Sequence, residues 1–276
     1  MTDWYVENYR DEMTYGIAVK ERIFDSQSDF QRVEIFEAVR FGRTLVIDGI
    51  FMTSERDEFL YHEMIVHPAL CTAKSIARVL IIGGGDGGTA REVLRHPEVE
   101  KVLMVEIDGM VVDVCKKYMP ALGAWDDPRL EVRIADGIAY MLDNDDPPWD
   151  VIILDGTDPV GPGEGLFNAA FYRTVKERLA PGGVFALQSE SPILDDVFFE
   201  IQDTLREIFG HVHPYFGPVP LYSAGVWSWT YATDDADPMA IVDERATRVE
   251  AHSKTYNREM HRAAFALPQY AKKRPG

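Results

Sequence analysis

The chain has 276 residues, of which 46% are hydrophobic, and is therefore long enough to bury a sizeable core. Its 46 acidic and 28 basic residues give a formal net charge of −18 at pH 7. Such a field repels nucleic acid and anionic membranes and attracts cations, although acidity that merely aids solubility is the simpler alternative. No apolar run approaches the roughly 20 residues that span a bilayer, and the acidic start does not resemble a secretory signal. We expect a cytoplasmic protein with neither nucleic acid nor membrane as a partner.

The N-terminal part predicts a small antiparallel β-sheet. Residues 16–25 and 30–42 alternate between polar and apolar side chains, as half-buried strands do. Residues 43–53 are typical of two strands joined by a tight turn at Asp48-Gly49, a favoured hairpin dipeptide.

The segment over residues 54–70 predicts a helix, with Ser54 as its candidate cap and a stop at Pro68. Its HEMIVH segment resembles a metalloprotease signature only superficially. His62 and His67 are five residues apart, or about 140° around a helix, so the two side chains diverge. We therefore expect no zinc site here.

From about residue 77 apolar strand candidates alternate with helical segments. The candidates are residues 78–83, 101–108, 130–136, 149–155 and 183–189, followed by 211–216 and 226–233 and a helical tail over 256–273. The first five are nearly all apolar, as expected of parallel strands covered on both faces. The α/β alternation predicts a Rossmann-like, doubly wound, mainly parallel sheet. We divide the chain into an N-terminal β domain, residues 1–55, and a Rossmann-like catalytic domain, residues 56–276.

The two cysteines, Cys71 and Cys115, both fall in apolar segments. We expect two buried free thiols rather than a disulfide, because free cysteine behaves as a small hydrophobic residue.

Carboxylates follow four successive strands of the predicted parallel sheet. They are Asp86 after the first strand, Glu106 and Asp108 after the second, Asp136 after the third, and Asp155 and Asp158 after the fourth. Ligands of doubly wound sheets bind at the carboxyl ends of the strands. Any one of these acids could simply cap a helix or face solvent, but four in succession favour a binding site.

The glycine-rich loop after the first strand fits a dinucleotide fingerprint through Gly83, Gly85 and Gly88, with Glu106 placed 18 residues after Gly88. Taken alone, this weak match supports a nicotinamide enzyme. Asp86 argues against it, because a phosphate 4 Å from that carboxylate would be repelled by about 4 kcal/mol at an effective dielectric near 20. S-adenosylmethionine has no phosphate but still carries a carboxylate. Its decarboxylated form lacks that carboxylate and has only two cationic groups, the sulfonium and a primary ammonium. The latter ligand suits the loop best.

The loop over residues 153–167 places Asp158 three residues after Asp155, among glycines and prolines. Two carboxylates on one irregular loop can converge on a single cation. A turn held by an Asx-type hydrogen bond is the alternative for Asp158.

Five segments resemble the spermidine synthases, the polyamine aminopropyltransferases: residues 55–64, 83–102, 155–162, 220–225 and 261–270. The resemblance covers nearly the whole chain. It implies a small β domain on a Rossmann-like catalytic domain, assembly as a homodimer or homotetramer, and no metal or bound cofactor. It also implies transfer of an aminopropyl group from decarboxylated S-adenosylmethionine, a co-substrate, to a diamine.

The resemblance further implies residue roles. Contacts to adenosine fall on Gln31, Glu106, Asp136, Gly137 and Pro162. Asp86 holds the aminopropyl end, and the amine channel is lined by Tyr61, His62, Asp86, Asp155, Asp158 and Tyr222. Asp155 is the proton acceptor, acting together with Tyr61.

Two departures from the family pattern leave the acceptor amine open. Gly156 stands where the family has serine, and Leu221, Ser223 and Ala224 replace threonine, proline and serine. Putrescine is the default acceptor, with cadaverine, spermidine and agmatine as alternatives. A methyltransferase and a non-catalytic polyamine-binding protein are the rival functions.

Overall fold

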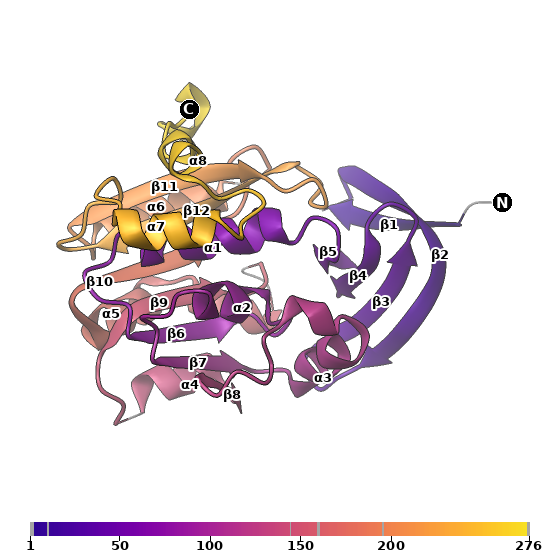
Figure 1. Ribbon diagram of the computed structural model, residues 1–276. Helices are drawn as coiled ribbons and strands as arrows, with labels where there is room; N and C mark the ends of the chain where they lie inside the picture. Colours follow the sequence, from indigo (N-terminus) through magenta and orange to yellow (C-terminus); the bar gives the residue numbers. More distant parts are fainter. Residues whose placement is uncertain (1–2, 10, 144, 159–160, 195, 275–276) are drawn as a thin grey trace.

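The computed structural model describes residues 3–9, 11–143, 145–158, 161–194 and 196–274. Within this part the chain forms two sheets, a five-stranded one and a seven-stranded one (Figure 1). The predicted α/β class, with a small antiparallel sheet before a mainly parallel one, is confirmed. The boundary after residue 55 stays a prediction.

The N-terminal sheet is antiparallel, in the order β1-β2-β3-β4-β5. Its strands are β1 (Asp3–Tyr9), β2 (Met13–Gln27), β3 (Arg32–Ala38), β4 (Gly42–Ile47) and β5 (Ile50–Ser54). The turn between β4 and β5 is the predicted one, because Asp48 and Gly49 both have a positive φ, 48° and 89°. Two such residues make the tight turn that matches the twist of a hairpin. β1 was not predicted.

The larger sheet has the order β11-β12-β10-β9-β6-β7-β8. Its strands are β6 (Arg78–Gly83), β7 (Lys101–Glu106), β8 (Leu130–Ile134), β9 (Trp149–Asp155), β10 (Leu179–Gln188), β11 (His211–Pro218) and β12 (Val226–Thr233). β6 to β10 pair in parallel, and β11 and β12 add an antiparallel edge. Because the order reverses between β6 and β9, the ends of these two strands form the topological switch point at which ligands bind.

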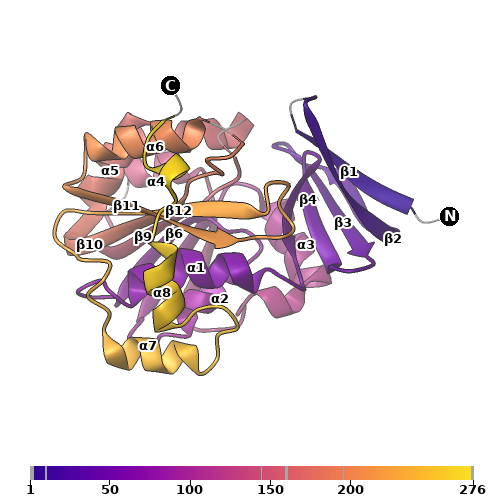
Figure 2. The same cartoon turned by 90° about the horizontal axis from the view of Figure 1, so that it is seen from above.

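Helices cover both faces of this sheet (Figure 2). One face carries α1 (Phe59–Leu70), α2 (Gly88–Leu94), α7 (Asp243–Glu250) and α8 (Arg258–Ala264). The other carries α4 (Gly137–Leu142), α5 (Ala169–Arg178) and α6 (Val197–Arg206). α3 (Gly109–Tyr118) and three short 3-10 turns, η1 (Pro120–Leu122), η2 (Gly161–Leu166) and η3 (Gln269–Ala271), complete the fold. Among the described residues, no helix is long and apolar enough to cross a membrane.

Both predicted ends of the first helix were wrong. Ser54 belongs to β5, and its hydroxyl donates to the Asp57 carboxylate at 2.6 Å. Pro68 lies inside α1, where its missing N–H frees the carbonyl of Met64 one turn earlier. The Tyr215 hydroxyl donates to that carbonyl at 2.9 Å, so a distant strand supplies the lost hydrogen bond. The helix therefore continues through the proline.

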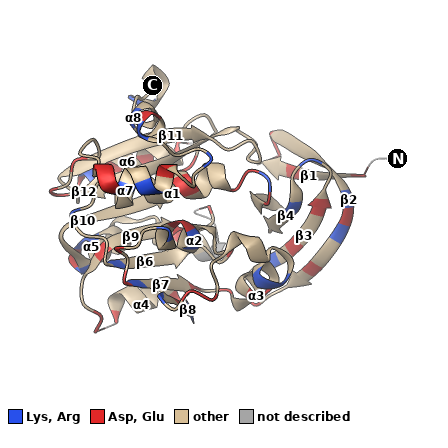
Figure 3. Ribbon diagram, in the orientation of Figure 1, with Lys and Arg blue, Asp and Glu red and all other residues tan. Residues whose placement is uncertain are grey.

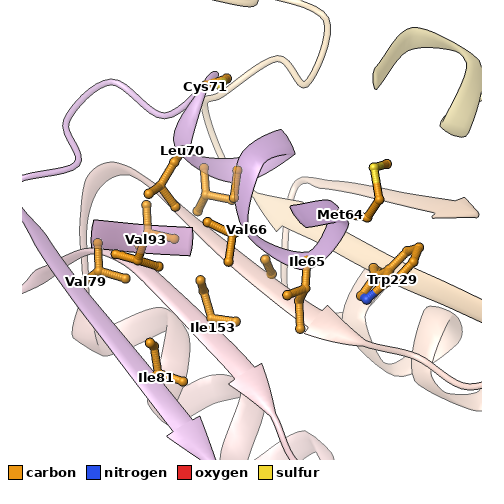
Figure 4. Packing of buried hydrophobic residues seen from close by; sticks show 14 of the residues in the cluster. Met64, Ile65, Val66, Leu70, Cys71, Val79, Ile81, Val93, Ile153 and Trp229 are labelled. Atoms are coloured by element: carbon orange, nitrogen blue, oxygen red, sulfur yellow. The ribbon is translucent and has the colours of Figure 1, made fainter. Parts of the chain in front are cut away.

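The core beneath α1 is built from the apolar side chains of α1, α2 and the central strands (Figure 4). The residues labelled there are Met64, Ile65, Val66, Leu70, Cys71, Val79, Ile81, Val93, Ile153 and Trp229, all buried. A second cluster, containing Val33, Ile35, Val114 and Cys115, joins the N-terminal sheet to α3. Both cysteines are buried and free, as predicted. Charged residues of both signs are spread over both sheets and their helices (Figure 3).

Ile153 is 0% exposed at the centre of β9, so Ile153→Ala should leave a cavity that the close-packed strands cannot fill. We expect the free energy of unfolding to fall by about 2–5 kcal/mol, measured by urea denaturation. Ile134→Ala, at a side chain that is 52% exposed, is the matched control and should change stability by no more than about 0.5 kcal/mol. Equal effects of the two substitutions would contradict this description of the core.

Candidate active site

A cleft opens at the carboxyl ends of β6, β7 and β9, between the large sheet and the N-terminal sheet. Nine of the residues to which the family resemblance assigns a role line it: Gln31, Tyr61, His62, Asp86, Glu106, Asp136, Gly137, Asp155 and Tyr222. The predicted strand-end acids thus meet at the switch point. Leu45, Ile47 and Met52 add an apolar wall from the small sheet.

The glycine loop lies directly against the end of β9. Gly83 has a φ of +84° and pairs with Asp155 across the strands, so a side chain there would collide with the Asp155 carbonyl. The N–H of Gly84 donates to the same carbonyl at 2.8 Å. Glycine is required at position 83 because the backbone of the loop contacts the backbone of Asp155 so closely that there is no room for a side chain.

Asp155 is held by a hydrogen bond on each carboxylate oxygen. The Tyr61 hydroxyl donates to Oδ1 at 2.7 Å, and the Thr89 hydroxyl donates to Oδ2 at 2.6 Å. Burial raises the pKa of the Asp155 carboxyl above its ordinary value; His62 and the two hydroxyl groups oppose the rise, and Asp86 adds to it. Such a carboxylate is fixed in place and more basic than an exposed one.

Asp86 faces the cleft from the loop before α2, with its side chain 12% exposed. Its Oδ1 accepts from the N–H of Gly88 at 2.8 Å, and its Oδ2 lies 3.2 Å from Nε2 of His62. Burial works against the charged form, yet His62 and the Gly88 N–H hold the pKa of Asp86 below its ordinary value. Asp86 is thus an ionised carboxylate beside the more basic Asp155.

Glu106 ends β7 and is buried next to the glycine loop. Its Oε1 accepts from the N–H of Asp108 at 2.9 Å. Burial raises the pKa of Glu106 to about 7, the Asp108 carboxylate adds to the rise, and the N–H groups of Asp108 and Gly85 oppose it. Asp108 in turn accepts from the Ser28 hydroxyl at 2.7 Å, and the oxygen of that hydroxyl accepts from the N–H of Gln31 at 3.0 Å. This chain of contacts ties Gln31 of the small sheet to the end of β7.

Asp136 and Gly137 begin α4 at the edge of the cleft. The Asp136 carboxylate caps this helix, accepting from the N–H groups of Ile138 at 2.7 Å and Ala139 at 3.2 Å. Helix capping was the alternative role for each of the strand-end acids, and Asp136 does cap a helix. It also lines the cleft. Pro162 belongs to η2, and its side chain lies outside the described part of the chain.

A second hollow adjoins the cleft and shares Met52, Tyr61, Gly156, Thr157 and Tyr222 with it. The polar side chains that line it but not the cleft include Glu7, Asp158, Glu190 and Ser223. The Tyr222 hydroxyl donates to the carbonyl of Met52 at 2.9 Å, which joins the residue 220–225 loop to the small sheet. Asp158 lies here and is not among the residues that line the cleft itself.

Sequence reasoning missed several polar side chains in or directly behind the site, among them Thr89, Glu58 and Glu7. Thr89 follows Asp86 by three residues at the start of α2, and that spacing was a usable signal for its place beside the loop. Glu58 lies four residues before His62, one helical turn away, and that spacing was also readable. Glu7 comes from β1, and nothing in its local sequence indicates that it reaches the hollow.

A Rossmann-like sheet whose switch point carries a glycine loop and several buried carboxylates defines an α/β enzyme with an adenosine-type, cationic ligand. Residues 58–244 match the spermine/spermidine synthase domain, and residues 3–55 match the spermidine synthase tetramerisation domain. The chain therefore belongs to the spermine/spermidine synthase family, the polyamine aminopropyltransferases.

Relatives and solved structures agree with this assignment. A polyamine aminopropyltransferase of Halorhodospira halophila is 42% identical, with 98% of this chain and 99% of that protein covered. One from Prochlorococcus marinus is 41% identical, with 96% and 94% covered. A crystal structure of spermidine synthase in complex with the transition state analogue AdoDATO superposes with a TM-score of 0.94 at 39% identity, covering 98% of this chain and 94% of that one. The spermidine synthase of Thermotoga maritima gives 0.92 at 38% identity, covering 98% and 93%.

Proposed function

We propose that this protein transfers the aminopropyl group of decarboxylated S-adenosylmethionine to putrescine, giving spermidine and 5'-methylthioadenosine, in polyamine biosynthesis. One observation carries the proposal: two differently tuned carboxylates, Asp86 and Asp155, line the same cleft beside the glycine loop. The ionised one suits the ammonium of the aminopropyl group. The more basic one suits the proton that the attacking amine must lose.

The reaction is a direct displacement at the carbon next to the sulfonium. The amine lone pair forms the new C–N bond while the C–S bond breaks, and the electron pair leaves on sulfur as a neutral thioether. An alkylamine has a pKa near that of lysine, about 10.4, so it must be deprotonated before or during attack. Asp155 accepts that proton, while Tyr61 and Thr89 keep its two oxygens in position.

Adenosine binding is assigned to the Glu106 side of the cleft. Glu106 offers carboxylate oxygens to the ribose hydroxyls, in the place where a dinucleotide-binding fold carries its ribose-binding acid. The remaining adenosine contacts are assigned to Gln31, Asp136, Gly137 and Pro162.

The distal ammonium of the acceptor is assigned to the adjoining hollow. Asp158 and Tyr222 line it, and Glu7 and Glu190 add carboxylates to its wall. A cationic chain that enters past Tyr61 therefore meets negative charge at its far end. His62, which lines the cleft, is assigned to the channel between the two substrates.

The direct test incubates the purified protein with decarboxylated S-adenosylmethionine and putrescine and measures products by mass spectrometry. We expect methylthioadenosine and spermidine in equal amounts. A parallel competition with cadaverine, spermidine and agmatine identifies the preferred acceptor. Absence of methylthioadenosine with every amine would overturn the proposal, and amine binding without turnover would favour a polyamine-binding protein.

The pKa of Glu106, raised by burial to about 7, makes nucleoside binding depend on pH. Ribose hydroxyls donate to the carboxylate form, so affinity for methylthioadenosine should rise as pH rises through that value and fall below it. Between about pH 8 and about pH 6 we expect about a tenfold loss, since the ionised fraction falls by that factor. Calorimetry at the two pH values measures it. Glu106→Gln should bind weakly at both, and a wild-type protein with no pH dependence would contradict this role.

We also propose that copies of the chain assemble through residues 3–55, because this segment matches a tetramerisation domain. A homotetramer or homodimer in the cytoplasm fits the family. Sedimentation velocity of the full chain tests the assembly, and a monomer at micromolar concentration would contradict it.

A further inference from the structure

The His62 side chain lies between two carboxylates, one on each ring nitrogen. Nδ1 is 2.7 Å from Oε2 of Glu58, and Nε2 is 3.2 Å from Oδ2 of Asp86. His62 is 2% exposed and Glu58 is 8% exposed, so water does not separate the partners. The ring also packs on Gly88, where any side chain would collide with it.

This geometry sets the number of protons on the ring. A neutral imidazole has one N–H, so one of the two carboxylates would face a lone pair at hydrogen-bond distance. Both carboxylates are stabilised in the charged form, because NH2 of Arg91 lies 2.7 Å from Glu58 Oε2 and Oδ1 of Asp86 accepts from the Gly88 N–H. This arrangement therefore favours donation from both ring nitrogens, which is the hydrogen-bonding pattern of an imidazolium.

The pairing continues behind the cleft as a row of alternating charge. The same Arg91 nitrogen lies 2.7 Å from Oε1 of Glu92, and Nε of Arg95 lies 3.0 Å from its Oε2. The row from Asp86 through His62, Glu58, Arg91 and Glu92 to Arg95 thus alternates negative and positive groups. Its charges balance in pairs, which is the arrangement that buried ions require.

We propose that Glu58 is a positioning residue for aminopropyl transfer: it keeps His62 doubly protonated, and His62 thereby holds the Asp86 carboxylate in the orientation that receives the aminopropyl ammonium. This rests on the proposed function for the role of Asp86, but not for the state of His62. Glu58 itself lies behind His62 and is not among the residues that line the cleft.

The charged groups around His62 determine what removal of Glu58 does. Glu58 and Tyr61 face it from α1, Asp86 and Arg91 from the glycine loop and α2, and Asp155 from β9. Burial opposes the charged ring, but Asp86 and Glu58 together raise the pKa of His62 well above its ordinary value. Without the Glu58 charge, Arg91 loses one of its two carboxylate contacts at 2.7 Å, and its positive charge disfavours the protonated ring, so the pKa of His62 should fall.

The test variant is Glu58→Gln, which keeps the shape of the side chain and removes its charge. We expect the KM for decarboxylated S-adenosylmethionine to rise about tenfold or more, with a smaller change in kcat, because the charge-assisted contact by which His62 holds Asp86 in position is weakened. The pH profile of kcat/KM for this donor should gain an extra ionisation. Glu58→Asp, which restores the charge, should return the profile toward wild type.

Glu55→Gln is the matched control. Glu55 is an exposed acid just before α1 that accepts from the N–H of Arg43 and has no contact with His62. It should leave KM and the pH profile unchanged. An equal effect of both substitutions would indicate a general loss of negative charge and overturn the positioning role.

Nuclear magnetic resonance of the imidazole groups tests the state of His62 without substrate. The chain has seven histidines, and the His62 signal is assigned by its loss in His62→Asn. In the wild-type protein we expect His62 to stay doubly protonated between about pH 6 and 9, and in Glu58→Gln to titrate within that range. Titration in the wild type near the ordinary value of 6.5 overturns the proposal even if Glu58→Gln does not fold. Because this measurement needs no turnover, its failure is distinct from failure of the proposed function.

Discussion

Asp155→Asn should lower kcat about 1,000-fold, which is within the usual contribution of a positioned general base. Asparagine has the same shape as aspartate and can still accept from Tyr61, so the cleft should keep its form. It cannot take the proton of the attacking amine. Affinity for methylthioadenosine should change little, because the adenosine contacts are assigned to the Glu106 side of the cleft. Single-turnover product formation and calorimetry measure the two quantities.

Asp150→Asn provides the control for this substitution. Asp150 lies on the same strand at the opposite end, where it accepts from the Ser75 hydroxyl and the N–H of Arg78. The kcat of the Asp150→Asn variant should stay near the wild-type value. If Asp155→Asn weakened turnover and nucleoside binding to the same extent, its effect would be structural rather than catalytic.

Asp86→Ala should weaken binding of decarboxylated S-adenosylmethionine about 100-fold, or about 2.7 kcal/mol. Two effects combine: the ammonium loses its carboxylate, and the His62 imidazolium, now without Asp86, repels it. Methylthioadenosine has no ammonium and should bind Asp86→Ala almost as well as wild type. Calorimetry with both ligands gives the difference directly.

The same titrations decide between aminopropyl and methyl transfer. The wild-type protein should prefer the decarboxylated ligand, because the carboxylate of S-adenosylmethionine would lie near Asp86, and Asp86→Ala should reduce that preference. Tighter binding of S-adenosylmethionine by the wild-type protein would favour a methyltransferase. Equal losses for methylthioadenosine and the aminopropyl donor would show that Asp86 merely shapes the loop.

The central sheet was readable from the sequence because its strands are continuous apolar runs at βαβ spacing. β6 and β9 begin and end where their patterns predicted, and the acids after them meet as the topology of a doubly wound sheet requires. Position at a strand end was enough to bring Asp86, Glu106 and Asp155 to one cleft. No long-range information was needed for these residues.

Features that depend on contacts between distant segments were not readable. Pro68 reads as a helix end, and only Tyr215, far along the chain, lets α1 continue. Glu7 lies in β1, and its place beside Asp158 depends on how the small sheet packs against the large one. His62 was recognised as a site residue, but its partners come from two different elements, so local sequence could not give its protonation state.

The two cysteines lie in separate parts of the interior. Cys71 ends α1 within the cluster under the large sheet, whereas Cys115 sits on α3 against β3 and β4. Burial raises the pKa of both thiols, so neither is a reactive thiolate in the folded protein. Each thiol can therefore report on one hydrophobic cluster, because it becomes reactive only when that cluster opens. Alkylation of one thiol before the other distinguishes loss of the small sheet from opening of the Rossmann-like core, without any engineered probe.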